Sequence, residues 1–401
     1  MRFSKRSKIN SFIVMDVMEQ ARKEELLGRD IVHMEVGQPG TPAPRNAIKE
    51  LTKKINSEPL GYTVALGIPE LRRKISNLYE DWYGLDINPD RVIVTSGSSG
   101  AFILAFTALF DTSDKVGIGA PGYPSYKQIL KALDIEPVII ETSLENKFQL
   151  SPKSIFSHEL DGLLVASPAN PTGSMLDLNE LTELINNCHN NNISFISDEI
   201  YHGIEYHKKA VSALEITDDC YVINSFSKYF SMTGWRIGWM VVPENHIRQV
   251  ERLAQNMFIC APHSSQIAAL GALSSGKELR QNLEVYKINR ELLIDGLKKA
   301  GFDKFAPPDG AFYVYADISQ FSSDSLSFCK SMLEKAGVAI TPGLDFDSKR
   351  GKQTIRFSYA RTTDEIKEGI RRIIEYMGNY FLIQDTYGVI LMTIIIFTQT
   401  N

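Results

Sequence analysis

Residues 221–228 read YVINSFSK and residues 194–201 read SFISDEIY, and these two stretches decide the fold class. Each begins with a short apolar run and ends in hydroxyl, carboxylate or amine side chains. Short runs that do not alternate with polar residues are typical of strands buried on both faces of a sheet. Ligands of a parallel sheet bind beyond the carboxyl ends of its strands, so we expect Asp198 and Lys228 at a binding site.

Five more apolar runs of this kind lie around those two stretches. They are VIVT (92–95), VGIG (116–119), VII (138–140), LLVA (163–166) and GWMVV (238–242). Amphipathic stretches such as 176–188 lie between several of them. Strands that alternate with helices indicate an α/β domain with a mainly parallel sheet.

The pattern changes towards the C-terminus. A long helical pattern at about 278–300 is followed by separated apolar runs with a helix among them, which indicates a smaller α+β domain. The expected division is therefore an N-terminal strap that packs with the small domain (1–44), a large domain (45–280), a small domain (281–378) and an atypical apolar tail (379–401).

Composition excludes several classes of function. The formal net charge is −5, which argues against a nucleic-acid partner, because such proteins need a basic face. The four cysteines are widely spaced, so we expect no disulfide framework, no metal site and a reducing, cytoplasmic setting. The apolar part of the tail, 389–397, is too short to span a bilayer, which argues against a membrane partner.

Residues suited to a phosphate follow two of the strands. The turn Ser96–Gly100 opens an apolar helix, where small residues, hydroxyls and free N–H groups suit an anion. Ser225, Ser227 and Arg236 follow the YVIN run, and an arginine fork matches phosphate oxygens. Lys228 has apolar neighbours, and a partly desolvated lysine can form a Schiff base. A plain strand-to-helix turn and exposed surface side chains are the alternatives for these motifs taken singly.

Two further strand ends carry polar groups. Asn170 is either a hydrogen-bond donor into the crevice or simply a turn residue before proline. The Asn170–Pro171 bond is expected to be cis, because X–Pro is the only common cis bond and fixes tight turns. A carboxylate at Asp198 needs a cation or several donors if it is buried, unless it only caps the next helix.

The ordered set of these motifs resembles the class I/II aminotransferases, the pyridoxal-phosphate (PLP) enzymes of the aspartate aminotransferase fold. The resemblance covers about residues 10–377. The matching segments are Gly37-Gln38-Pro39, Tyr62-Thr63 with Gly67 and Leu71-Arg72, Ser96–Gly100, Pro121-Gly122-Tyr123, Asn170-Pro171-Thr172-Gly173, Asp198–Tyr201, Ser225–Lys228 with Arg236, and Ile355-Arg356-Phe357-Ser358. The resemblance implies an α/β protein of PLP-dependent transferase fold type I. Its large domain has a mainly parallel seven-stranded sheet flanked by helices, and its smaller domain is α+β.

The resemblance also implies roles for the matched residues. Lys228 carries PLP as a Schiff base and moves the proton, and Asp198 pairs with the pyridinium nitrogen. Arg356 grips the substrate α-carboxylate as a bidentate pair, helped by the backbone at Gly37. The other implied contacts are Asn170 and Tyr201 to the phenolic oxygen of the ring, Tyr123 stacked on the ring, Ser98, Ser99, Ser225, Ser227 and Arg236 to the phosphate, and Tyr62 to the phosphate of the neighbouring subunit. The resemblance also makes Asn170 a substrate contact and Tyr201 a catalytic residue. Because Tyr62 would reach the site of the neighbouring subunit, it implies a homodimer with shared active sites.

The expected activity is transfer of an amino group between an L-amino acid and a 2-oxo acid. A PLP-dependent carbon–sulfur lyase is the alternative, because it needs the same lysine, aspartate and arginine. A ligand-sensing regulator would need a DNA-binding module, and a hydride-transfer enzyme would need a dinucleotide fingerprint. Neither is present in the sequence.

The side chain of the substrate is expected to be neutral. A dicarboxylate needs a second cation, and no Lys or Arg stands between Arg252 and Lys277, where Met257–Ile259 is apolar. We expect Phe12, Ile13 and Met15 to add to this apolar wall. The pattern favours aliphatic or aromatic amino acids.

Overall fold

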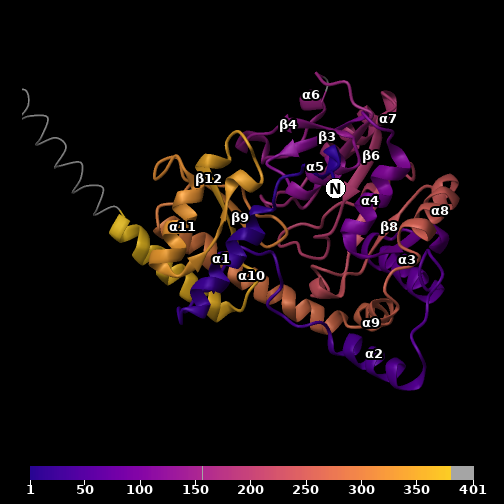
Figure 1. The fold of residues 1–401 in the computed structure, drawn as a ribbon, viewed down its shortest axis with the longest axis horizontal. Helices are drawn as coiled ribbons and strands as arrows, with labels where there is room; N and C mark the ends of the chain where they lie inside the picture. The colour runs from indigo at the N-terminus through magenta and orange to yellow at the C-terminus, as the bar shows by residue number, and fades with distance from the viewer. Residues whose placement is uncertain (156, 381–401) are drawn as a thin grey trace, which may run out of the picture.

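The computed structural model describes residues 1–155 and 157–380 of the 401-residue chain (Figure 1). The expected apolar tail lies outside the described residues from position 381 onward. In the part that the structure describes, no helix is both long and apolar enough to cross a membrane.

A seven-stranded sheet forms the centre of the larger part, in the order β2-β8-β7-β6-β5-β3-β4. Its strands are β2 (Val92–Thr95), β3 (Lys115–Ala120), β4 (Glu136–Glu141), β5 (Gly162–Ala166), β6 (Ser194–Asp198), β7 (Tyr221–Ser225) and β8 (Gly238–Val241). The strand β8 runs antiparallel to β2 and β7, whereas the other neighbouring pairs are parallel. The expected seven-stranded, mainly parallel sheet is confirmed.

Helices cover both faces of this sheet because its strands are apolar on both faces. Successive side chains of a strand point to opposite faces, so Ile93 and Ile223 pack on one side and Val94 and Val222 on the other. The helices α4 (Gly97–Leu109), α5 (Pro124–Ala132) and α8 (Ile247–Met257) cover the first face. The helices α3 (Pro69–Tyr83), α7 (Leu178–Asn190) and α9 (His263–Leu273) cover the second, and α2 (Arg45–Ser57) packs on α9.

A second core lies beside the main sheet. It contains an antiparallel sheet of β11 (Thr341–Pro342), β12 (Thr354–Ser358) and β9 (Tyr313–Asp317), and a parallel pair of β1 (Val32–His33) and β10 (Val338–Ala339). The helices α1 (Ile13–Leu26), α10 (Gly276–Lys299), α11 (Ser325–Ala336) and residues 363–380 pack around these strands. In Figure 1 the indigo α1 accordingly lies among the orange C-terminal elements. The expected smaller α+β part is confirmed, while the domain boundaries stay a prediction.

Local sequence explains where several of these elements begin and end. Asp177 and Glu180 form a capping box at the start of α7, and Asp324 caps α11. The helix α3 ends at Gly84, whose φ of 72° lies in the left-handed region that favours glycine. The short helix α6 (Pro152–Ile155) completes the set of described α-helices.

Candidate active site

The topology brings three of the predicted residues to one edge of the sheet. Asp198 is the last residue of β6, Lys228 follows the end of β7 by three residues, and Asn170 follows β5. Because β5, β6 and β7 are neighbours and parallel, their carboxyl ends meet at the same edge. The Asn170–Pro171 bond is cis, as predicted.

Lys228 is half-buried against aromatic rings. Its Nζ donates a 2.7 Å hydrogen bond to the carbonyl oxygen of Gly37 and lies 5.7 Å from the centre of the Tyr201 ring. Burial, followed by the charges of Arg356 and Arg236, lowers the pKa of the amine to about 7. Much of this amine is therefore neutral near pH 7, which is the form that attacks a carbonyl carbon.

Asp198 is a buried carboxylate, 3% exposed. Its Oδ2 accepts a hydrogen bond from the hydroxyl of Tyr126, and its Oδ1 accepts a 3.1 Å bond from the N–H of Ile200. Burial raises its pKa to about 6. Within the described residues no Lys or Arg lies at ion-pair distance from it, so a cationic N–H of a bound ligand would supply the missing partner.

Arg356 is held on β12, and one of its three guanidinium nitrogens has no partner among the described residues. Its Nη1 donates a 2.8 Å hydrogen bond to Asn170 Oδ1, and its Nη2 donates to the carbonyl oxygen of Glu35. The guanidinium stacks on the rings of Tyr313 and Phe346, whose centres lie 4.4 Å and 4.7 Å away. Its Nε is buried and has no hydrogen-bond partner among the described residues. A buried unused donor on a fixed arginine suits a carboxylate ligand.

Tyr201 and Gly37 meet at a third residue, Tyr313. The hydroxyls of Tyr201 and Tyr313 are 2.8 Å apart. A Cβ atom at position 37 would lie 1.6 Å from the hydroxyl oxygen of Tyr313. Glycine at this position is therefore what lets the loop lie against the ring of Tyr313.

The first turn of α4 and Arg236 form a cradle for an anion. A Cβ atom on Gly97 would lie 2.6 Å from Arg236 Nη2, and one on Gly238 would lie 3.0 Å from the backbone nitrogen of Ser98. Both glycines thus allow the guanidinium and the helix N-terminus to approach closely, and both of these groups attract a phosphate. Ser99 lies in the same turn of α4.

The two hydroxyls predicted for the phosphate lie next to each other at the end of β7. Ser225 Oγ and Ser227 Oγ are 2.9 Å apart, and both side chains are buried. Ser225 Oγ also lies 3.1 Å from the carbonyl oxygen of Ile237, the residue after Arg236. The hydroxyl pair therefore lies beside the segment that carries the arginine.

Tyr123 lies near Asp198, whereas Tyr62 is apart from the other residues. The ring of Tyr123 makes edge contacts with Phe12 at 5.8 Å and Tyr126 at 5.2 Å, and Tyr126 bonds Asp198. Tyr62 is 83% exposed, and in the described part of this single chain no hydrogen bond or ring contact joins it to the site.

Sequence reasoning missed several residues that complete the site. Tyr126 follows Tyr123 by three positions on α5, so the helical spacing was a usable signal. Tyr313 and Phe346 carried no signal, because their role depends on how the second core packs. Lys127 was also missed: with Tyr123 and Phe346 it lines a cavity of about 360 Å³.

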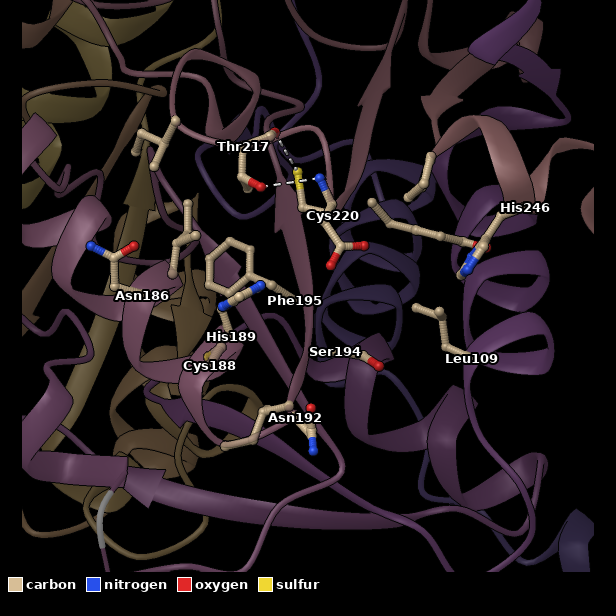
Figure 2. A pocket seen from close by; sticks show the side chains of 16 residues that line it. Leu109, Asn186, Cys188, His189, Asn192, Ser194, Phe195, Thr217, Cys220 and His246 are labelled. Atoms are coloured by element: carbon tan, nitrogen blue, oxygen red, sulfur yellow. Dashed lines mark hydrogen bonds between the residues drawn. The ribbon is translucent and has the colours of Figure 1, made fainter.

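A separate cavity of about 500 Å³ lies at the opposite, amino edge of the sheet (Figure 2). Ser194 and Tyr221, the first residues of β6 and β7, contribute to its wall together with His189 and His246. It contains none of the residues that the motifs single out.

The residues at the carboxyl edge fit PLP. A buried carboxylate without a cation suits a pyridinium N–H, the cradle at α4 suits a phosphate, and a half-buried amine of lowered pKa suits an aldehyde carbon.

The comparisons with known proteins point to one family. The family model described as aminotransferase class I and II matches residues 29–373. The chain is 44% identical to the valine–pyruvate aminotransferase of Mycobacterium tuberculosis, over 93% of this chain and 97% of that protein. It is 32% identical to an aspartate aminotransferase of Thermotoga maritima, over 93% of this chain and 99% of that one. A solved structure of a protein from Silicibacter pomeroyi is 60% identical, with a TM-score of 0.91 over 94% of this chain and 100% of that one.

Proposed function

This chain belongs to the class I and II aminotransferases and is PLP-dependent, and we propose that it transfers the amino group of a neutral aliphatic or aromatic L-amino acid to a 2-oxo acid. The observation that carries the proposal is the meeting of Lys228, Asp198 and Arg356 at one edge of the sheet. These three side chains offer an amine, a carboxylate and an unused guanidinium donor.

Each of these groups has a task in such a transfer. Lys228 would hold the cofactor covalently through a Schiff base, which its lowered pKa supports. Asp198 would hold the proton on the ring nitrogen, while Asn170 and Tyr201 would orient the ring. When bound, PLP supplies an electron sink for the electrons left at the substrate Cα. Once released, the Lys228 amine would take the proton from that Cα and pass it to the cofactor.

Phosphate binding would use the groups at the start of α4 and around Arg236. The convergence of that guanidinium with the first N–H groups of the helix supports this. The remaining contacts would come from the hydroxyls of Ser98, Ser99, Ser225 and Ser227, and Tyr123 would cover a face of the ring.

The substrate would be anchored by its α-carboxylate on Arg356. The buried, unpartnered Nε supports this, because an arginine already fixed by Asn170 and two rings loses little freedom on binding. The ring of Phe12 beside Tyr123 supports an apolar site for the side chain. The similarity to a valine–pyruvate aminotransferase favours the same class of substrate.

A homodimer with shared sites would complete the centre. Tyr62, Val64 and Ile259 are all exposed on this chain. Their two segments lie side by side, because His263 Nδ1 lies 2.9 Å from the carbonyl oxygen of Gly61. Such an apolar surface suits a second copy, whose Tyr62 would reach the phosphate.

The four free cysteines agree with a reducing, cytoplasmic setting.

Two half-reactions test the proposal. Adding an L-amino acid to the PLP form should convert its absorbance to that of pyridoxamine phosphate, and adding a 2-oxo acid should reverse the change. A carbon–sulfur lyase would instead release ammonia and pyruvate from a sulfur-containing amino acid. Absence of the reversible conversion with every donor would refute the proposal.

A further inference from the structure

The segment after β1 supplies hydrogen-bond acceptors to Lys228 and Arg356. The carbonyl oxygen of Glu35 accepts hydrogen bonds from Arg356 Nη2 and from Thr341 Oγ1, the latter at 2.8 Å. Two residues later, the carbonyl oxygen of Gly37 accepts the bond from Lys228. The position of residues 35–37 therefore sets where the guanidinium lies.

The side chain of Glu35 is a buried carboxylate beside that carbonyl group. It is 1% exposed, and its Oε1 lies 2.8 Å from His33 Nδ1. Its Oε2 has no hydrogen-bond partner in the described part of the chain. A carboxylate buried in this way is unstable without a cation. His33 is the group that supplies one.

His33 lies among three carboxylates. Besides Glu35, its Nε2 lies 3.0 Å from Oε1 of Glu25 on α1. The third is Glu365. Burial raises the pKa of this carboxyl group, but hydrogen bonds from Thr362 and then the charges of Arg361 and His33 lower it below its ordinary value. The hydrogen bond to Glu35, opposed by burial, raises the pKa of His33 to about 9. At neutral pH the ring is therefore charged, and both of its N–H groups donate to carboxylates.

We propose that the His33–Glu35 ion pair positions Arg356 for the substrate. By holding the Glu35 backbone, the pair fixes the carbonyl oxygen that binds Nη2, so that the guanidinium keeps one position for the incoming α-carboxylate. His33 and Glu35 are positioning residues that act through Arg356. The inference rests on the proposed function, since it needs Arg356 to bind that carboxylate.

A binding measurement on the holoenzyme tests the pair without turnover. The probe is isovalerate, the carbon skeleton of valine without its amino group, titrated by calorimetry. Glu35→Gln and His33→Gln should each weaken its Kd about tenfold, because a charge-assisted contact to a buried group is lost. Glu25→Gln is the matched control on the other side of His33. Glu25 is 43% exposed, and its variant should change Kd less than about twofold.

In steady-state assays KM should rise in the two pair variants, while kcat stays within about threefold of wild type.

The pH dependence of isovalerate binding gives a second test. Because the pKa of His33 is raised, the ion pair is intact below its ordinary pKa and is lost as pH rises through about 9. Isovalerate affinity of the wild type should therefore fall between about pH 8 and pH 10. Glu35→Gln should flatten this fall, since a glutamine needs no charged ring.

Several outcomes would overturn the inference. These are an unchanged Kd in both pair variants, an equal loss in Glu25→Gln, or the same alkaline fall in Glu35→Gln. If Glu35→Gln does not fold, His33→Gln and the wild-type pH profile decide the matter. Arg356→Lys distinguishes a failure of the proposed function from a failure of the positioning role. If it leaves isovalerate binding unchanged, the proposed role of Arg356 fails; if it weakens binding and the pair variants do not, the positioning role alone fails.

Discussion

Lys228 Nζ donates a 2.7 Å hydrogen bond to the carbonyl oxygen of Gly37, which lies 191 residues earlier in the chain. The bond joins the loop after β7 in the main sheet to the segment after β1 in the second core. The amine is thereby held at the junction of the two cores, next to the ring of Tyr201. The side chains proposed for the Schiff base and for the substrate carboxylate, Lys228 and Arg356, therefore both bond to the segment 35–37.

Replacing Lys228 by Ala should abolish transamination while the protein still folds. The lysine is expected to be both the covalent anchor and the proton carrier, and both roles disappear together. Single-turnover kinetics and circular dichroism would check the two parts of the prediction. Turnover above about a hundredth of the wild-type rate would contradict the assignment.

Asp198→Asn should leave PLP bound and slow the proton-transfer step about a hundredfold or more. An amide cannot hold the proton of the ring nitrogen by charge. Stopped-flow absorbance of each half-reaction measures the effect, and a spectrum of the purified variant checks that PLP is present. Unchanged half-reaction rates would mean that Asp198 serves only as a local cap.

Tyr126→Phe should shift the pH dependence of PLP binding. Burial raises the pKa of Asp198 to about 6, and the bond from Tyr126 opposes that rise. The ionised carboxylate proposed to pair with a pyridinium is thus protonated as pH falls through about 6. Without the hydroxyl the pKa rises further, so the acidic midpoint should move up by about one pH unit. Fluorescence titration of the cofactor-free enzyme with PLP measures it, and a midpoint that does not move would contradict the prediction.

A panel of amino donors with a fixed 2-oxo acid tests the substrate class. Valine, leucine and phenylalanine should give higher kcat/KM than aspartate, because an apolar site discriminates by about 1–3 kcal/mol for each methylene-sized gain in fit. Lys127→Met is a useful companion, since Lys127 lines the cavity beside Tyr123. Aspartate exceeding the neutral donors would contradict the prediction, and loss of that preference in Lys127→Met would identify the second cation.

Mixing two inactive variants tests the shared site. If Tyr62 serves the neighbouring subunit, a heterodimer of Lys228→Ala and Tyr62→Ala has one site with both residues intact. Co-refolding the two variants should then restore up to about a quarter of the wild-type activity, the share expected from random pairing. No restoration, or a monomeric mass by sedimentation, would show that each chain works alone.

The sequence alone determined the architecture and most of the residues at the carboxyl edge of the sheet. The apolar runs are local features of the chain, and Asp198 and Lys228 follow them within a few positions. A parallel sheet gathers all such strand ends at one edge, so a local pattern was enough to group them.

Only the tertiary structure decided what each of those side chains contacts. Tyr126 and Asp198 are 72 residues apart, Asn170 and Arg356 are 186 apart, and Glu35 and Arg356 are 321 apart. These contacts arise from the packing of α5 on the main sheet and of the second core against its edge, and no short-range periodicity encodes them. The physical reason is that water is excluded from the packed core. A buried charge there is stabilised only by the groups that the packing places beside it.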